Sequence, residues 1–193
     1  ISEHEGVNVG FLPLTQGNIL DVAFNCLGDR YGWGGMLDAM DCSLYTKEIY
    51  QCFGIELPRD TSKQKNTPVL VHDISEMTIE EKQNYIEKAP VGSLLYFPGH
   101  TMIYIGTENE KSYVISALGS FVQGEDAITS YSVVVNPLTV KIKNGLTWID
   151  SLTSILTPVD NEKHGTSDNI KDNGNIKYAE NVTSEMSNAD YWK

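Results

Sequence analysis

The chain has 193 residues, of which 40% are hydrophobic, so it is long enough to build one substantial core. Its 26 acidic and 14 basic residues give a formal net charge of −12, which argues against nucleic acid or an anionic lipid surface as the main partner. No stretch approaches the roughly 20 consecutive apolar residues that a membrane-spanning helix needs, so we predict no transmembrane segment.

The first third of the chain carries helical patterns separated by a glycine-rich stretch. Apolar residues recur at helical spacing after Gly17 and Asn18, either of which could cap the helix. A second amphipathic stretch follows Asp41 and stops before Gly54, which stands where a helix C-terminus favours glycine. The predicted elements are a helix over 17–27, a loop over 31–40, a helix over 41–53 and a short helix over 62–65.

The second half changes to short segments rich in β-branched and aromatic residues, separated by turn residues, which predicts an antiparallel sheet. Helices first and strands afterwards are typical of an α+β domain. Polar residues 66–89 are interpreted as a variable insertion that contains a helix. The predicted elements are a helix over 78–88, strands over 93–97, 101–105, 113–117 and 131–135, and a final helix over 146–156.

These patterns divide the chain into an N-terminal segment (1–16), one folded domain (17–157) and a polar C-terminal tail (158–193). The chain starts at Ile1 without an initiator Met or a signal-peptide pattern, so we interpret it as a processed or truncated piece.

Cys42 is the best candidate for a nucleophile. It stands between Asp41 and Ser43 at a predicted helix start, where unpaired N–H groups and the helix dipole favour the thiolate. We therefore expect a lowered pKa for this thiol. The other two cysteines, Cys26 and Cys52, lie in apolar surroundings and are interpreted as small buried hydrophobes.

His100 is the candidate base. It follows a Pro-Gly turn and begins a predicted strand, and a strand start can meet a helix start in space whatever their sequence separation. The other histidines lie in polar or terminal segments and are interpreted as surface residues: His4, His72 and His164.

Several motifs now combine into a family resemblance that extends over about residues 17–122. They are, in chain order, Leu27–Gly35, Asp41–Ser43, Phe53–Ser62, Val91–Phe97 and His100–Gly106. In this order they resemble the NlpC/P60 family of cell-wall cysteine peptidases. The resemblance implies a papain-like α+β core, with N-terminal helices packed on a central antiparallel sheet, and makes 17–157 its catalytic domain.

The resemblance also implies a reaction. Cys42 would attack an amide carbonyl, and His100 would act as base and then as acid toward the leaving amine. The oxyanion would accept hydrogen bonds from the backbone N–H of Cys42 and from the Tyr31 hydroxyl. The bond typically hydrolysed in this family joins γ-D-glutamate to a diamino acid, meso-diaminopimelate or L-Lys, in peptidoglycan stem peptides.

Five residues are implied as substrate-binding by similarity to relatives that carry bacterial SH3 domains: Trp33, Asp41, Ser43, Arg59 and Thr61. The acidic Asp41 suits a free substrate amine, and it equally suits the role of a helix N-cap, with which the first role is compatible.

One position departs from the family pattern. The family usually supplies a third polar residue, commonly His, on the strand after the catalytic His. Alignment places Ser116 there, so we expect it to orient the imidazole without supplying charge. Ser120 or a backbone carbonyl are the alternatives for this role.

Partners and location are further implied by the resemblance. The partners would be peptidoglycan peptides, and SH3-like domains could stand on the N-terminal side. The location would be secreted or at the cell envelope, with cytoplasmic muropeptide recycling as the alternative.

Neither a metal nor a cofactor is expected, because no His-x-x-x-His or Cys-x-x-Cys spacing occurs in the sequence. Two other functions stay open: a catalytically weak peptidoglycan-binding module, and a papain-like amidase or acyltransferase.

Overall fold

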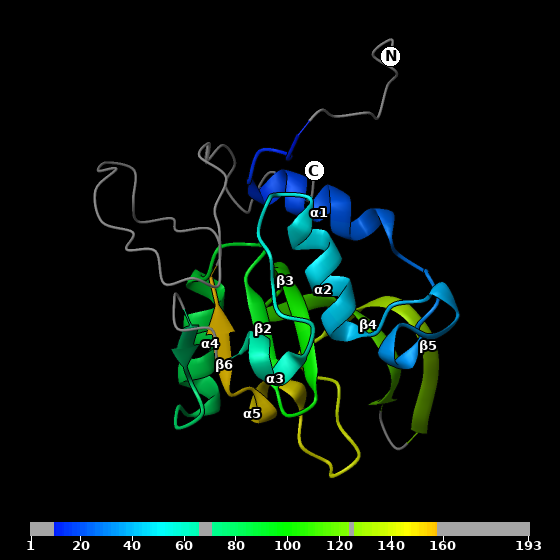
Figure 1. Ribbon diagram of the computed structural model, residues 1–193. Helices are drawn as coiled ribbons and strands as arrows, with labels where there is room; N and C mark the ends of the chain where they lie inside the picture. The colour runs from blue at the N-terminus through cyan, green and yellow to red at the C-terminus, as the bar shows by residue number, and fades with distance from the viewer. Residues whose placement is uncertain (1–9, 66–70, 124–125, 158–193) are drawn as a thin grey trace, which may run out of the picture.

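A computed structural model of the protein describes residues 10–65, 71–123 and 126–157 (Figure 1). The predicted C-terminal tail and much of the N-terminal segment lie outside the described residues. The helices are α1 (Gln16–Asn25), α2 (Cys42–Gln51), α3 (Thr61–Gln64), α4 (Ile79–Lys88) and α5 (Trp148–Ser151). The strands are β1 (Val71–Asp73), β2 (Leu94–Phe97), β3 (His100–Glu108), β4 (Lys111–Gln123), β5 (Asp126–Pro137) and β6 (Ser154–Leu156).

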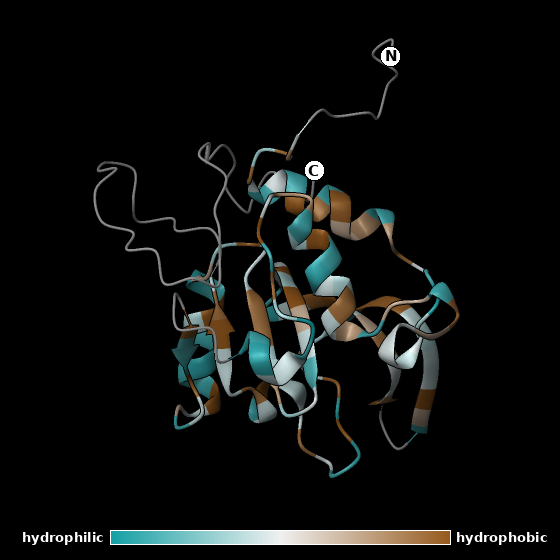
Figure 2. Ribbon diagram, viewed as in Figure 1, coloured by the Kyte–Doolittle hydropathy of each residue, from teal (hydrophilic) through white to brown (hydrophobic). Residues whose placement is uncertain are grey.

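The strands form a single six-stranded sheet in the order β1-β6-β2-β3-β4-β5, with every neighbouring pair antiparallel. Helix α2 packs on β3 and β4, and α1 packs on α2. Hydrophobic residues gather along β2 and β6 and on α1 and α2, whereas α4 is largely hydrophilic (Figure 2). The expected α+β class, with helices on a central antiparallel sheet, is confirmed.

Helix α2 begins where its sequence predicts. Asp41 has an extended backbone, and its side chain accepts a hydrogen bond from the backbone N–H of Leu44 at 2.9 Å, which caps the helix. Beyond its last turn, Gly54 has a φ of +75°, a left-handed conformation that glycine adopts without strain. These two ends fix Cys42 as the first residue of the helix.

The buried face of α2 fixes the position of the helix on the sheet. Ile49 is 2% exposed, and Tyr45 and Tyr50 are fully buried. The Tyr45 hydroxyl donates to the carbonyl of Ala23 in α1 at 3.0 Å, and the Tyr50 hydroxyl donates to the carbonyl of Gly92 just before β2. Burial supplies the energy, and the two hydroxyl groups fix the register of the helix.

Strand β3 brings the second key residue to the same region. Phe97 of β2 pairs with His100 of β3 across a tight turn, in which Gly99 has a φ of +85°. The strand is buried over His100–Gly106, because it lies inside the sheet beneath α2. His100 therefore begins a buried strand, as the sequence predicts.

Some elements differ from the sequence-based expectation. The cap of α1 is Thr15, whose hydroxyl accepts from the backbone N–H of Asn18 at 3.1 Å, and not Gly17 or Asn18. The predicted helix over 146–156 is wrong in its second half, because residues 154–156 form β6 between β1 and β2. Strand β1, inside the predicted insertion, has no signal of its own and exists through pairing with β6.

We predict that Ile49→Ala lowers the free energy of unfolding by about 3 kcal/mol, because it leaves a cavity between α2 and the sheet. Chemical denaturation with a fluorescence readout measures this change. Glu48→Ala, on the exposed side of the same helix turn, is the control and should stay within about 0.5 kcal/mol of the parent. Equal losses for both variants would contradict the packing described here.

Candidate active site

Cys42 lies at the start of α2 with its sulfur against the start of β3. Its Sγ is 3.8 Å from the hydroxyl oxygen of Thr61, and it also accepts hydrogen bonds from the backbone N–H groups of Ser43 and Thr101. Thr101 is the residue that follows His100 on β3. The cysteine is 8% exposed, so its sulfur is enclosed on most sides and open on one.

His100 is held from two sides. Its Nε2 lies 3.1 Å from the hydroxyl oxygen of Ser116 on the neighbouring strand β4. Its ring packs against Phe97, with centroids 5.2 Å apart, and against the edge of Trp148, with centroids 5.3 Å apart. With Nε2 directed at Ser116, Nδ1 is the ring nitrogen left for other partners.

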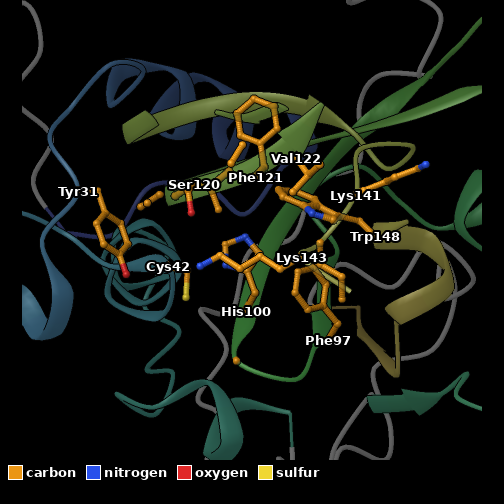
Figure 3. Close-up of a pocket in the computed structure, with 16 residues that line it drawn as sticks. Tyr31, Cys42, Phe97, His100, Ser120, Phe121, Val122, Lys141, Lys143 and Trp148 are labelled. Carbon is orange, nitrogen blue, oxygen red and sulfur yellow. The ribbon is translucent and has the colours of Figure 1, made fainter. Parts of the chain in front are cut away.

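A cavity of about 300 Å³ joins these groups. Cys42 and His100 both line it, together with Tyr31 and Ser120. Figure 3 shows Tyr31 and Cys42 at one end, His100 in the middle and Trp148 beyond it. The sequence-predicted nucleophile and base thus face one shared space.

Burial sets the protonation states of the pair. It raises the pKa of the Cys42 thiol above its ordinary value, and it outweighs the N–H of Thr101 and the hydroxyl of Thr61, which act in the opposite direction. Burial also lowers the pKa of His100 to about 4. The resting pair is therefore a neutral thiol and a neutral imidazole, and the expected lowering of the thiol pKa is wrong.

Asp41 is occupied by protein donors. Its Oδ1 accepts three hydrogen bonds, from Leu44 N, the Ser43 hydroxyl and Arg59 Nη1, and its Oδ2 accepts two, from Gly34 N and Arg59 Nη2. Burial alone would raise the pKa of this carboxyl, but the hydrogen bonds from Arg59 and Leu44 outweigh it and hold the pKa below its ordinary value. The N-cap role of Asp41 is present in the structure.

The five substrate-binding candidates are not all gathered at the cavity. Thr61 touches the Cys42 sulfur, whereas Asp41, Ser43 and Arg59 form a cluster beside it, with Ser43 accepting from Arg59 Nη1 at 3.0 Å. Trp33 lies on the glycine-rich loop, is 73% exposed and does not line the cavity.

Trp148 is a site residue that the sequence analysis missed, because it lies in the segment predicted as a long helix. It is buried against Phe97 and His100. Helix α5, which carries it, is held by the buried Lys82 of α4, whose Nζ donates to the carbonyls of Asp150 and Leu152 at 2.8 Å. The one signal in the sequence that could have identified Trp148 is that it is an aromatic residue shortly after the strands predicted over 113–117 and 131–135.

Comparison with known proteins identifies the family. A sequence model of the NlpC/P60 family matches residues 28–132, more than half of the chain. The chain belongs to the NlpC/P60 family. Members of this family are peptidases and peptidoglycan hydrolases, and Cys42, His100 and Ser116 all lie inside the matched range.

A curated relative is dipeptidyl-peptidase 6 of Lysinibacillus sphaericus, which is 31% identical over 103 residues. The aligned part is 53% of this chain and 32% of the relative, so the chain spans about a third of the curated protein it matches.

A solved structure of the family shares the fold. An NlpC/P60 endopeptidase from Photobacterium damselae subsp. piscicida superposes with a TM-score of 0.61 at 19% identity, over 72% of this chain and 38% of that one. An NlpC/P60 family protein from Bacillus cereus gives a TM-score of 0.49 at 21% identity, over 76% of this chain and 41% of that one. The first of these supports the papain-like core.

In 10–65, 71–123 and 126–157, no group of three or more His, Cys, Asp or Glu side chains could hold a metal ion. The same residues contain no helix that is long and apolar enough to cross a membrane.

We predict that His100 makes folding sensitive to mild acid. With a pKa of about 4 in the folded state and about 6.5 when unfolded, His100 takes up its proton first in the unfolded chain as the pH falls. The contribution of His100 to the free energy of unfolding is complete above its unfolded-state pKa. It is lost as the pH falls toward its folded-state pKa. The free energy of unfolding should drop by about 2 kcal/mol between pH 7 and pH 5.

Denaturation at both pH values, in the parent and in His100→Gln, measures this contribution, and the variant should lose most of the drop. His72→Gln, which changes an exposed histidine, should keep the parental difference. The same pH dependence in all three proteins would contradict a buried neutral His100.

Proposed function

We propose that this protein is a cysteine peptidase that hydrolyses the bond between γ-D-glutamate and a diamino acid in peptidoglycan stem peptides. The observation that carries the proposal is the single cavity that Cys42 and His100 line together, with Ser116 bound to the far nitrogen of the imidazole. Membership in the NlpC/P60 family supports the reaction class.

The first step forms a tetrahedral intermediate, which becomes a thioester when the amine leaves. His100 is neutral at physiological pH and can take the Cys42 proton while the sulfur attacks the carbonyl carbon. The carbonyl oxygen becomes an oxyanion that accepts from the backbone N–H of Cys42 and from Tyr31. Burial raises the pKa of Tyr31, so its hydroxyl stays protonated and can donate.

The second step releases the amine. The carbon–nitrogen bond breaks as the imidazolium of His100 gives its proton to the leaving nitrogen. Water then attacks the thioester with His100 again as base, which yields the free carboxylate and restores the thiol. The imidazole therefore passes one proton in each half of the reaction, first from Cys42 to the leaving amine and then from water to the sulfur.

Ser116 acts on the tautomer of His100. Its hydroxyl oxygen can accept from Nε2–H, which leaves Nδ1 unprotonated and ready to act as the base. A hydroxyl carries no charge, so it stabilises the imidazolium less than a carboxylate would. The imidazolium is therefore a strong acid toward the leaving amine and the imidazole is a weak base toward the thiol.

We propose that the residues beside the Cys42 sulfur contact the acyl part of the substrate, the part that includes γ-D-glutamate. Thr61 touches Cys42, and Ser43 and Arg59 are within reach through the cluster around Asp41. The acyl part of the peptide would lie along this cluster, toward Trp33 at its rim. An incoming substrate amine would share Asp41 with Arg59, because the protein's own donors already fill the carboxylate.

One observation favours a second candidate, a peptidoglycan-binding module with weak catalysis. The resting pair is neutral and Ser116 adds no charge, which is the arrangement expected if turnover had become unimportant. The two candidates differ in a measurable way, because a binding module would retain stem peptides without cutting them.

We predict that a digest of defined stem peptides, analysed by mass spectrometry, yields L-Ala-γ-D-Glu and the free diamino acid portion. Cys42→Ala should abolish the products, because no other described group can form the thioester at that cavity. Cys52 is exposed, so its predicted burial is wrong, and Cys52→Ala should keep full activity. Products from Cys42→Ala would remove Cys42 from the mechanism, and binding without products by the parent would favour the second candidate.

We further predict that His100→Ala lowers kcat by about 10³-fold, the usual scale of a general acid–base residue. Ser116→Ala should lower it only about tenfold, the scale of one hydrogen bond. Steady-state kinetics on the same peptide compares them. Equal losses would mean that Ser116 does more than orient the ring.

A further inference from the structure

The far end of the cavity is formed by the loop that connects β5 to α5, which the reaction described above does not use. Residues 141–143 of this loop line the cavity together with Trp148. Lys141 and Lys143 are both exposed, and Figure 3 shows Lys141 extending outward on the side of Trp148 that lies away from Cys42.

This loop is fixed by backbone hydrogen bonds. Lys141 and Val122 exchange both N–H groups with each other's carbonyls at 3.0 Å, which pins the loop to the end of β4. The N–H of Trp148 donates to the carbonyl of Val140 at 2.8 Å, and the N–H of Ile142 donates to that of Leu146 at 2.9 Å. On this fixed loop, the ammonium groups of Lys141 and Lys143 are charged donors that can meet a ligand.

The end of the cavity formed by this loop carries positive charge without a neighbouring carboxylate among the lining residues. No Asp or Glu is among the residues that line the cavity, and His100 is neutral, so Lys141 and Lys143 supply its only formal charges. The ion pairs within residues 10–65, 71–123 and 126–157 are Arg59–Asp41 and Lys63–Asp60, and neither includes these lysines. In a chain with a net charge of −12, a cavity end with two cations is a local exception.

The position of this loop in the cavity indicates which part of the substrate reaches the two lysines. His100 must hand its proton to the leaving amine, so the leaving group lies on the imidazole side of the sulfur. Trp148 contacts His100, and Lys141 extends outward beyond Trp148 on the side away from Cys42 (Figure 3). The loop that carries the two lysines therefore lies toward the leaving group, and not toward the acyl part.

We propose that Lys141 and Lys143 form a carboxylate-binding subsite for the far end of the amine-side diamino acid. The proposal rests on the proposed function and names its preferred substrate. A diamino acid with a carboxylate at its distal end, such as meso-diaminopimelate, would find two cations there. L-Lysine would bring only a third ammonium group to the same place and would be repelled.

The test compares three peptides that share L-Ala-γ-D-Glu and differ in the third residue: meso-diaminopimelate, its distally amidated form, and L-lysine. We expect the parent protein to favour the first over both others by about tenfold or more in kcat/KM. The double variant Lys141→Gln and Lys143→Gln should raise KM for the first peptide about tenfold with little change in kcat, and bring the three peptides close together.

The matched control removes two other exposed lysines, Lys88→Gln and Lys111→Gln, neither of which lines the cavity. It should keep the parental preference. Equal kcat/KM values for the three peptides in the parent, or an unchanged preference in the Lys141/Lys143 variant with an unchanged melting temperature, would overturn the subsite. If the parent cuts none of the peptides, the proposed function itself fails, which is a distinct outcome.

Discussion

The structure depends on the contact between the first turn of α2 and the first residues of β3. Asp41 caps the helix, the buried face around Ile49 seats it on the sheet, and the Pro-Gly turn after Phe97 starts the strand at His100. The Cys42 sulfur consequently meets the backbone N–H of Thr101, beside the imidazole. Two residues 58 positions apart are joined by the packing of one helix on one strand.

The same packing decides the chemistry of the pair. Removing water from Cys42 and His100 favours the neutral form of both, so the proton starts on sulfur. A nucleophile of this kind is activated during attack and not beforehand, which protects the thiol from unwanted oxidation. The base must then be correctly oriented in advance, which gives Ser116, Phe97 and Trp148 their importance.

Local signals in the sequence were sufficient to place Cys42 at a helix start and His100 at a strand start, whereas Ser116 was predicted only from the resemblance to the family. The sequence could not predict the protonation of the pair, because desolvation depends on how closely α2 lies on the sheet. Nor could it reveal Trp148 or the two lysines, which reach the cavity only because the loop after β5 returns across the end of β4. Strands β1 and β6 are similarly defined by their pairing and not by their own residues.

The account is tested most directly by trapping the acyl-enzyme. The protein is mixed with an L-Ala-γ-D-Glu-diamino acid peptide, quenched in acid within milliseconds, digested and analysed by mass spectrometry. We expect a thioester carrying L-Ala-γ-D-Glu on the peptide that contains Cys42, and none on those with Cys26 or Cys52. Product formation with no adduct on Cys42, or an adduct on either other cysteine, would contradict it.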